Sequence, residues 1–435
     1  MAFLHTDSCD SLKSELSLFN LPSTQTVIEN SHWVQYKPIS SLTDQAPIEF
    51  TIPGNSEYLD LAHTMLSLRV AITPIKPVKD GDTPPVVGPV NNFMHSLFNQ
   101  VDVFFNQKPV SPPNNAYAYR SYIETLLNYG PTAKNSHLSS VLWYDDTAGK
   151  MDNADAANVG FAKRQSAMTD KKIDLLGYLH VDVLNMDRLL LGGVEVRVRL
   201  VRSRDSFCLM DPDAAYTVHI TEATLFVRRV KVNPSISLAH EKMLSKVTAK
   251  YPLTRVEVKN VTLNSGVHGQ SIDNVILGQL PKRIIIGFIE NKAYNGDTKL
   301  NPFNFKNFNI NFLCLYVDGV QVPSKPLQPD FKNTKMYVDA YHTLFSGTGV
   351  HFSNTGNSIS RDAYPNGYCL FAFDLTPDLS ANNDTHWNLI RRGSVRIDVR
   401  FDDALDAVVN CIIYAEYDNL LEIDSSRQVL VDYSG

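Results

Sequence analysis

Four blocks of sequence recur in the same order in the two halves of the chain, and this repetition constrains the fold more than any other feature. The blocks are a hairpin, a tyrosine-rich helix and two strands. The matched positions are Asn106-Gln107 and Asp318-Gly319 in the hairpin, Gly130 and Gly347 at the helix C-cap, Gly177 and Gly367 in one strand, and Val194 and Val395 in the next. A shared order over four blocks predicts that one domain has been duplicated.

The first half carries an insertion between its helix and its next strand. Residues 131–176 occupy this place in the first half and the shorter segment 348–366 occupies it in the second. The insertion contains YDDTAGKMDNADAANVGFAKR, which is small, polar and charged. We therefore expect a surface loop that projects from the outer end of the first domain.

Short alternating runs of apolar and polar residues fill both halves. MLSLRVAI at Met65, VEVRVRL at Val194 and VRIDVRF at Val395 are typical. Period-two alternation rich in β-branched residues predicts antiparallel strands with one buried face. About eight such strands in each half, with long connections, favour a jelly roll over an up-and-down barrel. The predicted fold class is all-β: two tandem eight-stranded antiparallel jelly rolls with a short helix in each and a helical connector.

The length of 435 residues also favours two domains, because one hydrophobic core stops growing at roughly 250 residues. We expect an N-terminal arm at 1–44, the first jelly roll at 45–234, a connector helix at 235–252 and the second jelly roll at 253–435. The connector has Ser235 or Ser237 as its expected N-cap, and it places Ala239, Met243 and Val247 on one face.

Several long blocks resemble the major capsid protein of Polinton/Maverick elements and adintoviruses. They include FNQVDVFFNQKPVSPPNNAYAYRSYIETLLNYG, ATLFVRRVKVNPSISLAHEKMLSKVTAKYP, NGYCLFAFDLTPDLS and YAEYDNLLEIDSSRQVLVDY. The resemblance covers nearly the whole chain. It implies a double-jelly-roll protein whose pseudo-hexagonal homotrimers tile an icosahedral virus shell. It also implies neighbouring capsomers, penton and minor capsid proteins as partners, and a place in the virion after assembly in the host cell.

Composition and motifs argue against an enzyme. A net charge of −6 and a pI near 6.1 do not suit a protein that neutralises phosphates, so no specific nucleic-acid binding is expected. The start lacks a signal sequence, and no apolar stretch approaches the ~20 residues that span a bilayer, so we expect no membrane insertion. The five scattered cysteines suggest reduced thiols. We predict no catalytic, cofactor-binding or metal-binding residues and no cofactor.

Some clusters of polar residues have two interpretations, one as a binding site and one as an ordinary surface group. The histidines His342 and His351, the carboxylates Asp402, Asp403 and Asp406, and the pair Asp145-Asp146 lack metal-ligand spacing and are interpreted as solvated polar groups. A basic set alternates along one strand and continues nearby. Its members are Arg197, Arg199, Arg202, Arg204, Arg228, Arg229 and Lys231. A patch facing packaged DNA is one interpretation, and salt bridges between subunits or an exposed strand face are favoured over it.

The N-terminal arm contains the one candidate contact site. In CDSLKSELSLFNLP, Leu12, Leu16 and Phe19 fall on one face of a predicted short helix that stops before Pro22. Two interpretations stay open: this helix packs on its own domain, or it docks on a neighbouring capsid component. The predicted function is a structural capsid protein, and the alternative is a β-sandwich module that binds carbohydrate or a receptor.

Overall fold

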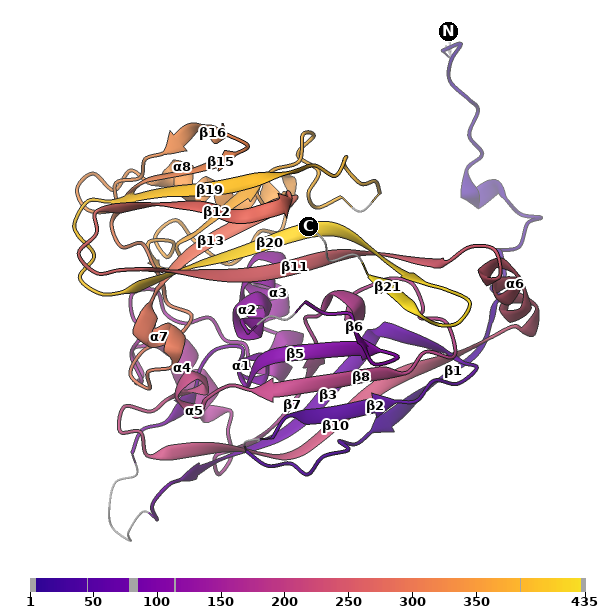
Figure 1. The fold of residues 1–435 in the computed structure, drawn as a ribbon, viewed down its shortest axis with the longest axis horizontal. Coiled ribbons are helices and arrows are strands. Elements are labelled where there is room, and N and C mark those ends of the chain that lie inside the picture. The colour runs from indigo at the N-terminus through magenta and orange to yellow at the C-terminus, as the bar shows by residue number, and fades with distance from the viewer. Residues whose placement is uncertain (1–4, 45, 78–84, 113–114, 384, 432–435) are drawn as a thin grey trace.

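Two β-sandwiches lie one above the other and are joined at one end by a short helix (Figure 1). The structure, a computed structural model, describes residues 5–44, 46–77, 85–112, 115–383 and 385–431. We call residues 28–232 the first roll and residues 249–431 the second roll. Buried apolar side chains form one cluster that runs through both rolls, so the two expected cores are continuous with each other.

The first roll has two four-stranded antiparallel sheets, in the spatial orders β1-β10-β3-β7 and β2-β8-β5-β6. Their strands are β1 (Ile28–Tyr36), β2 (Ile48–Ile52), β3 (Tyr58–Pro74), β5 (Phe98–Phe105), β6 (Lys108–Pro109), β7 (Lys172–Tyr178), β8 (Val196–Arg202) and β10 (Tyr216–Val232). In β8, Val196, Val198 and Leu200 are buried and the residues between them are partly exposed, as the alternating sequence predicts.

The second roll repeats both sheets, in the orders β11-β20-β13-β18 and β12-β19-β15-β16. Its strands are β11 (Ala249–Leu263), β12 (Gly269–Gln279), β13 (Arg283–Glu290), β15 (Ile310–Val317), β16 (Val320–Leu327), β18 (Leu370–Asp374), β19 (Arg392–Phe401) and β20 (Val409–Ile423), and β21 (Val429–Val431) pairs with β20. Strand for strand the two orders are the same. The predicted duplication and the predicted fold class are therefore confirmed.

The two matched hairpins make equivalent hydrogen bonds to the neighbouring strand. Asn106 donates its N–H to the carbonyl of Glu195 (3.0 Å) and accepts the N–H of Glu195 on its side-chain oxygen (2.9 Å). Asp318 makes the same pair of bonds with Ser394, at 3.0 and 2.8 Å. Both central residues of each turn have positive φ, which is the geometry that suits two-residue hairpins. The same hairpin structure therefore occurs once in each roll.

Two of the four block matches are correct in their strands and wrong in their register. Val196 pairs with Phe105 and Val395 pairs with Val317, so the counterpart of Val395 is Val196 rather than Val194. Likewise β7 ends one residue after Gly177, whereas β18 begins three residues after Gly367. Apolar alternation repeats every two residues, so sequence matching alone tolerates such slips.

Each roll carries one longer helix where the sequence predicts it, α2 (Tyr117–Asn128) and α8 (Val338–Ser346). Neither following glycine has the predicted left-handed conformation, because φ is −82° at Gly130 and −73° at Gly347. Gly347 is required for another reason: a Cβ there would lie 2.4 Å from the carbonyl oxygen of Ala372.

Short elements complete the fold. The helices are α1 (Phe93–Ser96), α3 (Pro131–Lys134), α4 (Val159–Ser166), α5 (Asp205–Cys208), α6 (Pro234–Leu244) and α7 (Asn291–Asn295), and the 3-10 turns are η1 (Ser14–Leu16), η2 (His137–Val141), η3 (Asp182–Leu184) and η4 (Val350–Phe352). Two small ribbons pair β4 (Gly88–Pro89) with β9 (Leu209–Met210), and β14 (Phe305–Lys306) with β17 (Asn366–Gly367).

The segments around the rolls differ in detail from the predicted boundaries. The stretch expected as arm, 1–44, contains β1, and the stretch expected as connector, 235–252, contains the start of β11. The N-cap of α6 is Asn233, whose side chain accepts the N–H of Ser235, so Ser235 and Ser237 are not the caps. Met243 and Val247, expected on one face of the connector, are 56% and 52% exposed, and Val247 lies beyond the end of α6.

Candidate assembly sites

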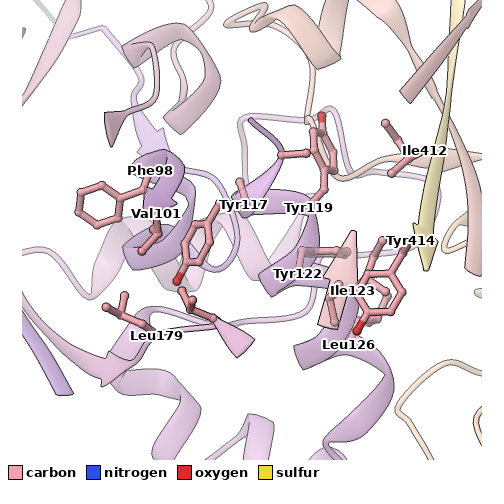
Figure 2. Packing of buried hydrophobic residues seen from close by; sticks show 14 of the residues in the cluster. Phe98, Val101, Tyr117, Tyr119, Tyr122, Ile123, Leu126, Leu179, Ile412 and Tyr414 are labelled. Carbon is pink, nitrogen blue, oxygen red and sulfur yellow. The ribbon is translucent and has the colours of Figure 1, made fainter. Parts of the chain in front are cut away.

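Helix α2 is the element that joins the two cores. Figure 2 shows its side chains between Phe98 and Val101 of the first roll on one side and Ile412 and Tyr414 of the second roll on the other. The ring of Tyr122 stacks on Phe303 of the second roll with 4.2 Å between centroids. Such pairs contribute roughly 0.5–1.5 kcal/mol beyond burial. The tyrosine-rich sequence of α2 is therefore the means by which the rolls are packed together.

A buried ionic network extends from the polar side of α2. Arg120 binds Asp182 at 2.7 Å and Glu124 at 2.8 Å. Glu124 also contacts His180 at 2.5 Å and accepts the hydroxyl of Tyr414 at 3.2 Å. Since Tyr414 lies on β20, this network crosses from the first roll to the second.

Burial and neighbouring charges act in opposite directions on the pKa values of Glu124 and Asp182 in this network. Burial alone would raise the pKa of Glu124, but the Arg120 guanidinium and the hydrogen bond from His180 hold that pKa at about 2. Burial raises the pKa of Asp182 although Arg120 opposes the shift. Burial and the neighbouring His180 ring lower the pKa of His95 well below its ordinary value. Removing one member would leave a buried charge without its partner.

The insertion in the first half is not a surface loop, so that prediction is wrong. Trp143, Phe161 and Arg164 within it are fully buried. The Arg164 guanidinium donates to the carbonyls of Pro89 (2.9 Å) and Tyr144 (2.7 Å) and binds Asp146 at 2.6 Å. We call residues 143–164 the clasp. Three of its polar residues, Asp146, Asn158 and Arg164, form a buried hydrogen-bonded interior, whereas others such as Lys150 and Lys163 are exposed.

The clasp reaches across to the second roll. Asp146 accepts the side-chain amide of Asn301 at 3.0 Å, and its backbone carbonyl accepts the hydroxyl of Tyr368 at 2.5 Å. Asp152 accepts the backbone N–H of Asn301 at 2.9 Å and the amide of Asn304 at 2.8 Å. The clasp thus fixes the second roll against the first.

The C-terminal segment makes a further connection between the rolls, at the β5–β6 hairpin of the first roll. Arg427 donates to the carbonyl of Gly192 at 2.9 Å and accepts the side-chain amide of Asn106 on its own carbonyl at 2.7 Å. Lys108 donates to the carbonyl of Val429 at 2.8 Å. The β5–β6 hairpin of the first roll therefore also contacts the second roll.

The N-terminal arm leaves the body of the molecule beyond α6 and projects away from both rolls (Figure 1). The predicted helix is only the 3-10 turn η1. Leu12, Leu16 and Phe19 are 71%, 65% and 96% exposed. In the part of the arm that the structure describes, these three side chains are therefore not buried against the first roll. Docking on a neighbour remains a proposal.

The basic residues along β8 and β10 do not form an open positive patch. Acidic or aromatic groups of the same chain contact most of them: Arg197 lies over Phe104, Arg199 near Glu49, Arg202 against Asp44, Arg228 against Asp60 and Lys231 against Glu29. Arg229 is buried and donates to the hydroxyl of Tyr36. Most of these basic residues therefore have a partner within the chain.

The remaining polar candidates are ordinary surface or structural groups. The rings of His342 and His351 lie 6.4 Å apart, Asp402 accepts the amide of Asn311, and Asp403 binds Lys332. In the parts of the chain that the structure describes, no group of three metal-ligating side chains converges. Among the same residues no helix is long and apolar enough to cross a membrane.

The clasp and the network at α2 were missed by sequence reasoning. The signal for the clasp was present, because Trp143, Met151 and Phe161 are large apolar residues in a segment interpreted from its polar members. The network had no signal, since Glu124 and Asp182 meet only through the fold.

Comparisons with known proteins establish the fold and identify a relative of nearly the same length. No protein-family model matches the chain. An uncharacterized protein of Caenorhabditis elegans is 26% identical over 430 residues, which cover 95% of this chain and 99% of that protein. A chain of the Sputnik virophage superposes with a TM-score of 0.64 at 12% identity, covering 98% of this chain and 93% of that one.

Two further solved structures have the same architecture. VP54 of the virus PBCV-1 superposes with a TM-score of 0.62 at 9% identity, covering 96% of this chain and 100% of that one. The mavirus major capsid protein superposes with a TM-score of 0.53 at 10% identity, covering 99% and 97%. These likenesses span both rolls, so the complete double jelly roll is shared.

Proposed function

We propose that this chain is the major capsid protein of a Polinton-type virus or element and that it forms homotrimeric capsomers of an icosahedral shell. The observation that carries the proposal is the pair of rolls with the same strand order, packed through one continuous core. The full-length likeness to a mavirus major capsid protein supports it.

The architecture suits a trimer that tiles a shell. Three copies present six rolls, which makes a capsomer with nearly hexagonal outline from a three-fold assembly. That outline requires a fixed angle between the rolls of one chain. The aromatic packing of α2, the buried network at Glu124 and the clasp all resist rotation of one roll against the other.

The arm is proposed as the segment that engages other capsid components. Three large apolar side chains, Leu12, Leu16 and Phe19, are exposed on it. Burying them would contribute about 1.5–3 kcal/mol each before ordering costs are subtracted. Neighbouring capsomers, penton and minor capsid proteins are the partners that this role implies, and the assembled protein would reside in the virion.

Size-exclusion chromatography with light scattering tests the trimer, and electron microscopy of the same fractions tests the shell. We expect a mass three times 48.7 kDa, and hexagonal capsomers or closed particles. A stable monomer that binds glycans on an array would instead support the carbohydrate- or receptor-binding module and overturn the capsid function.

A further inference from the structure

A groove of about 510 Å³ lies where the second roll meets the tip of the β5–β6 hairpin of the first roll. Its lining includes four large apolar side chains, Trp387, Ile390, Leu420 and Leu430, and two basic ones, Lys108 and Arg392. Trp387, Ile390 and Leu430 are 42%, 55% and 49% exposed. An apolar concave surface with an aromatic residue and a basic rim is typical of a binding site for an apolar segment.

The charge at the groove is positive once internal pairs are removed. Two acidic residues, Asp418 and Glu422, also line the groove, but both are already bound, Asp418 by Lys282 at 2.9 Å and Glu422 by Lys250 at 3.4 Å. Arg392 makes no ion pair with any residue that the structure describes. An occupant of this groove should therefore be apolar and acidic.

The N-terminal arm has this chemistry. Its exposed apolar residues include Leu12, Leu16 and Phe19, and in 5–21 the acidic residues Asp7, Asp10 and Glu15 outnumber the single Lys13. In its own chain the segment 5–21 projects away from the rolls (Figure 1), and all of its residues except Ser17 are exposed.

We propose that the arm of one copy inserts Leu12, Leu16 and Phe19 into the groove at Trp387 of a neighbouring copy. This inference rests on the proposed shell function and adds the surface that receives the arm. Because Lys108 and Leu430 come from different rolls, the groove is complete only when the rolls are docked. The arm would therefore bind folded chains and not unfolded ones.

Disulfide trapping between two different full-length chains tests the contact. Cys9, the exposed cysteine, is first replaced by serine in both, and the other four cysteines are buried. One chain then carries Phe19→Cys and the other Ile390→Cys, so that a heterodimeric cross-link forms only between copies. The matched control replaces Ile390→Cys with Leu379→Cys, which lies near the same loop, is 74% exposed and does not line the groove.

We expect at least tenfold more cross-linked dimer with Ile390→Cys than with Leu379→Cys, in capsomers or in particles. Equal cross-linking at both positions, or none at Ile390→Cys, overturns the arm–groove contact. If trimers and particles still form in that case, the shell function stands and only this inference fails. If the chain is monomeric and gives no cross-link, both fail.

Discussion

At the scale of single residues, Arg164 is the side chain on which the clasp depends most. It is fully buried, and its three hydrogen-bonding nitrogens bind Pro89, Tyr144 and Asp146. Arg164→Leu removes the charge that compensates buried Asp146, so we expect a loss of about 3–5 kcal/mol in the free energy of unfolding, measured by chemical denaturation. The adjacent exposed Lys163→Leu is the matched control and should change little. Equal stability of the two variants would contradict the structural role of the clasp.

A second residue-scale prediction concerns pH. The pKa of His95 is lowered by burial and by His180, so the unfolded chain takes up a proton below about pH 6.5 before the folded chain does. Stability is therefore full above that pH and is lost as pH falls below it, and His95→Asn should weaken this dependence. Melting temperatures between pH 7.5 and 5 check this, with the exposed His351→Asn as control. A slope unchanged by His95→Asn would show that other groups cause the acid sensitivity.

At the scale of elements, the sequence and the structure lead to opposite predictions for the clasp. Composition predicts that 145–160 can be exchanged for a short Gly-Ser linker at no cost. The structure predicts the opposite, because the exchange removes Asp146, Met151 and Asp152 from the seam between the rolls. We expect an insoluble chain or a large fall in melting temperature, whereas deleting residues 1–22 should leave the melting temperature unchanged. A soluble exchange variant with normal melting would restore the surface-loop interpretation.

The strands, both hairpins and the longer helices are predictable from sequence because alternation, turn residues and repetition are local signals. What could not be predicted depends on contacts between distant residues. Asp146 meets Asn301, and Glu124 meets Tyr414, only after both rolls have folded. The helix predicted for Leu12, Leu16 and Phe19 is reduced to the 3-10 turn η1, since an isolated short helix has little stability without a surface to pack on. The role of these residues as a contact site stays a prediction.

At the scale of the whole molecule, we expect the arm to be needed for assembly into particles but not for folding or trimer formation. Residues 5–22 are exposed apart from Ser17, so we expect the deletion of residues 1–22 to give soluble trimers of unchanged stability. The same trimers should assemble poorly into closed particles, because the apolar contact between copies is lost. Light scattering and electron microscopy of the two chains in parallel measure this. Normal particles from the truncated chain would disprove the role of the arm, and a truncated chain that does not fold would place the arm in the core.

The clasp also has an evolutionary consequence. A duplicated domain begins as two equivalent copies, either of which can be lost or exchanged for the other. In this chain the first half carries residues 143–164, and the second half carries their binding partners Asn301, Asn304 and Tyr368. The two halves are therefore no longer equivalent. Loss of either half would leave the hydrogen-bonding groups of the other half at this seam without their partners.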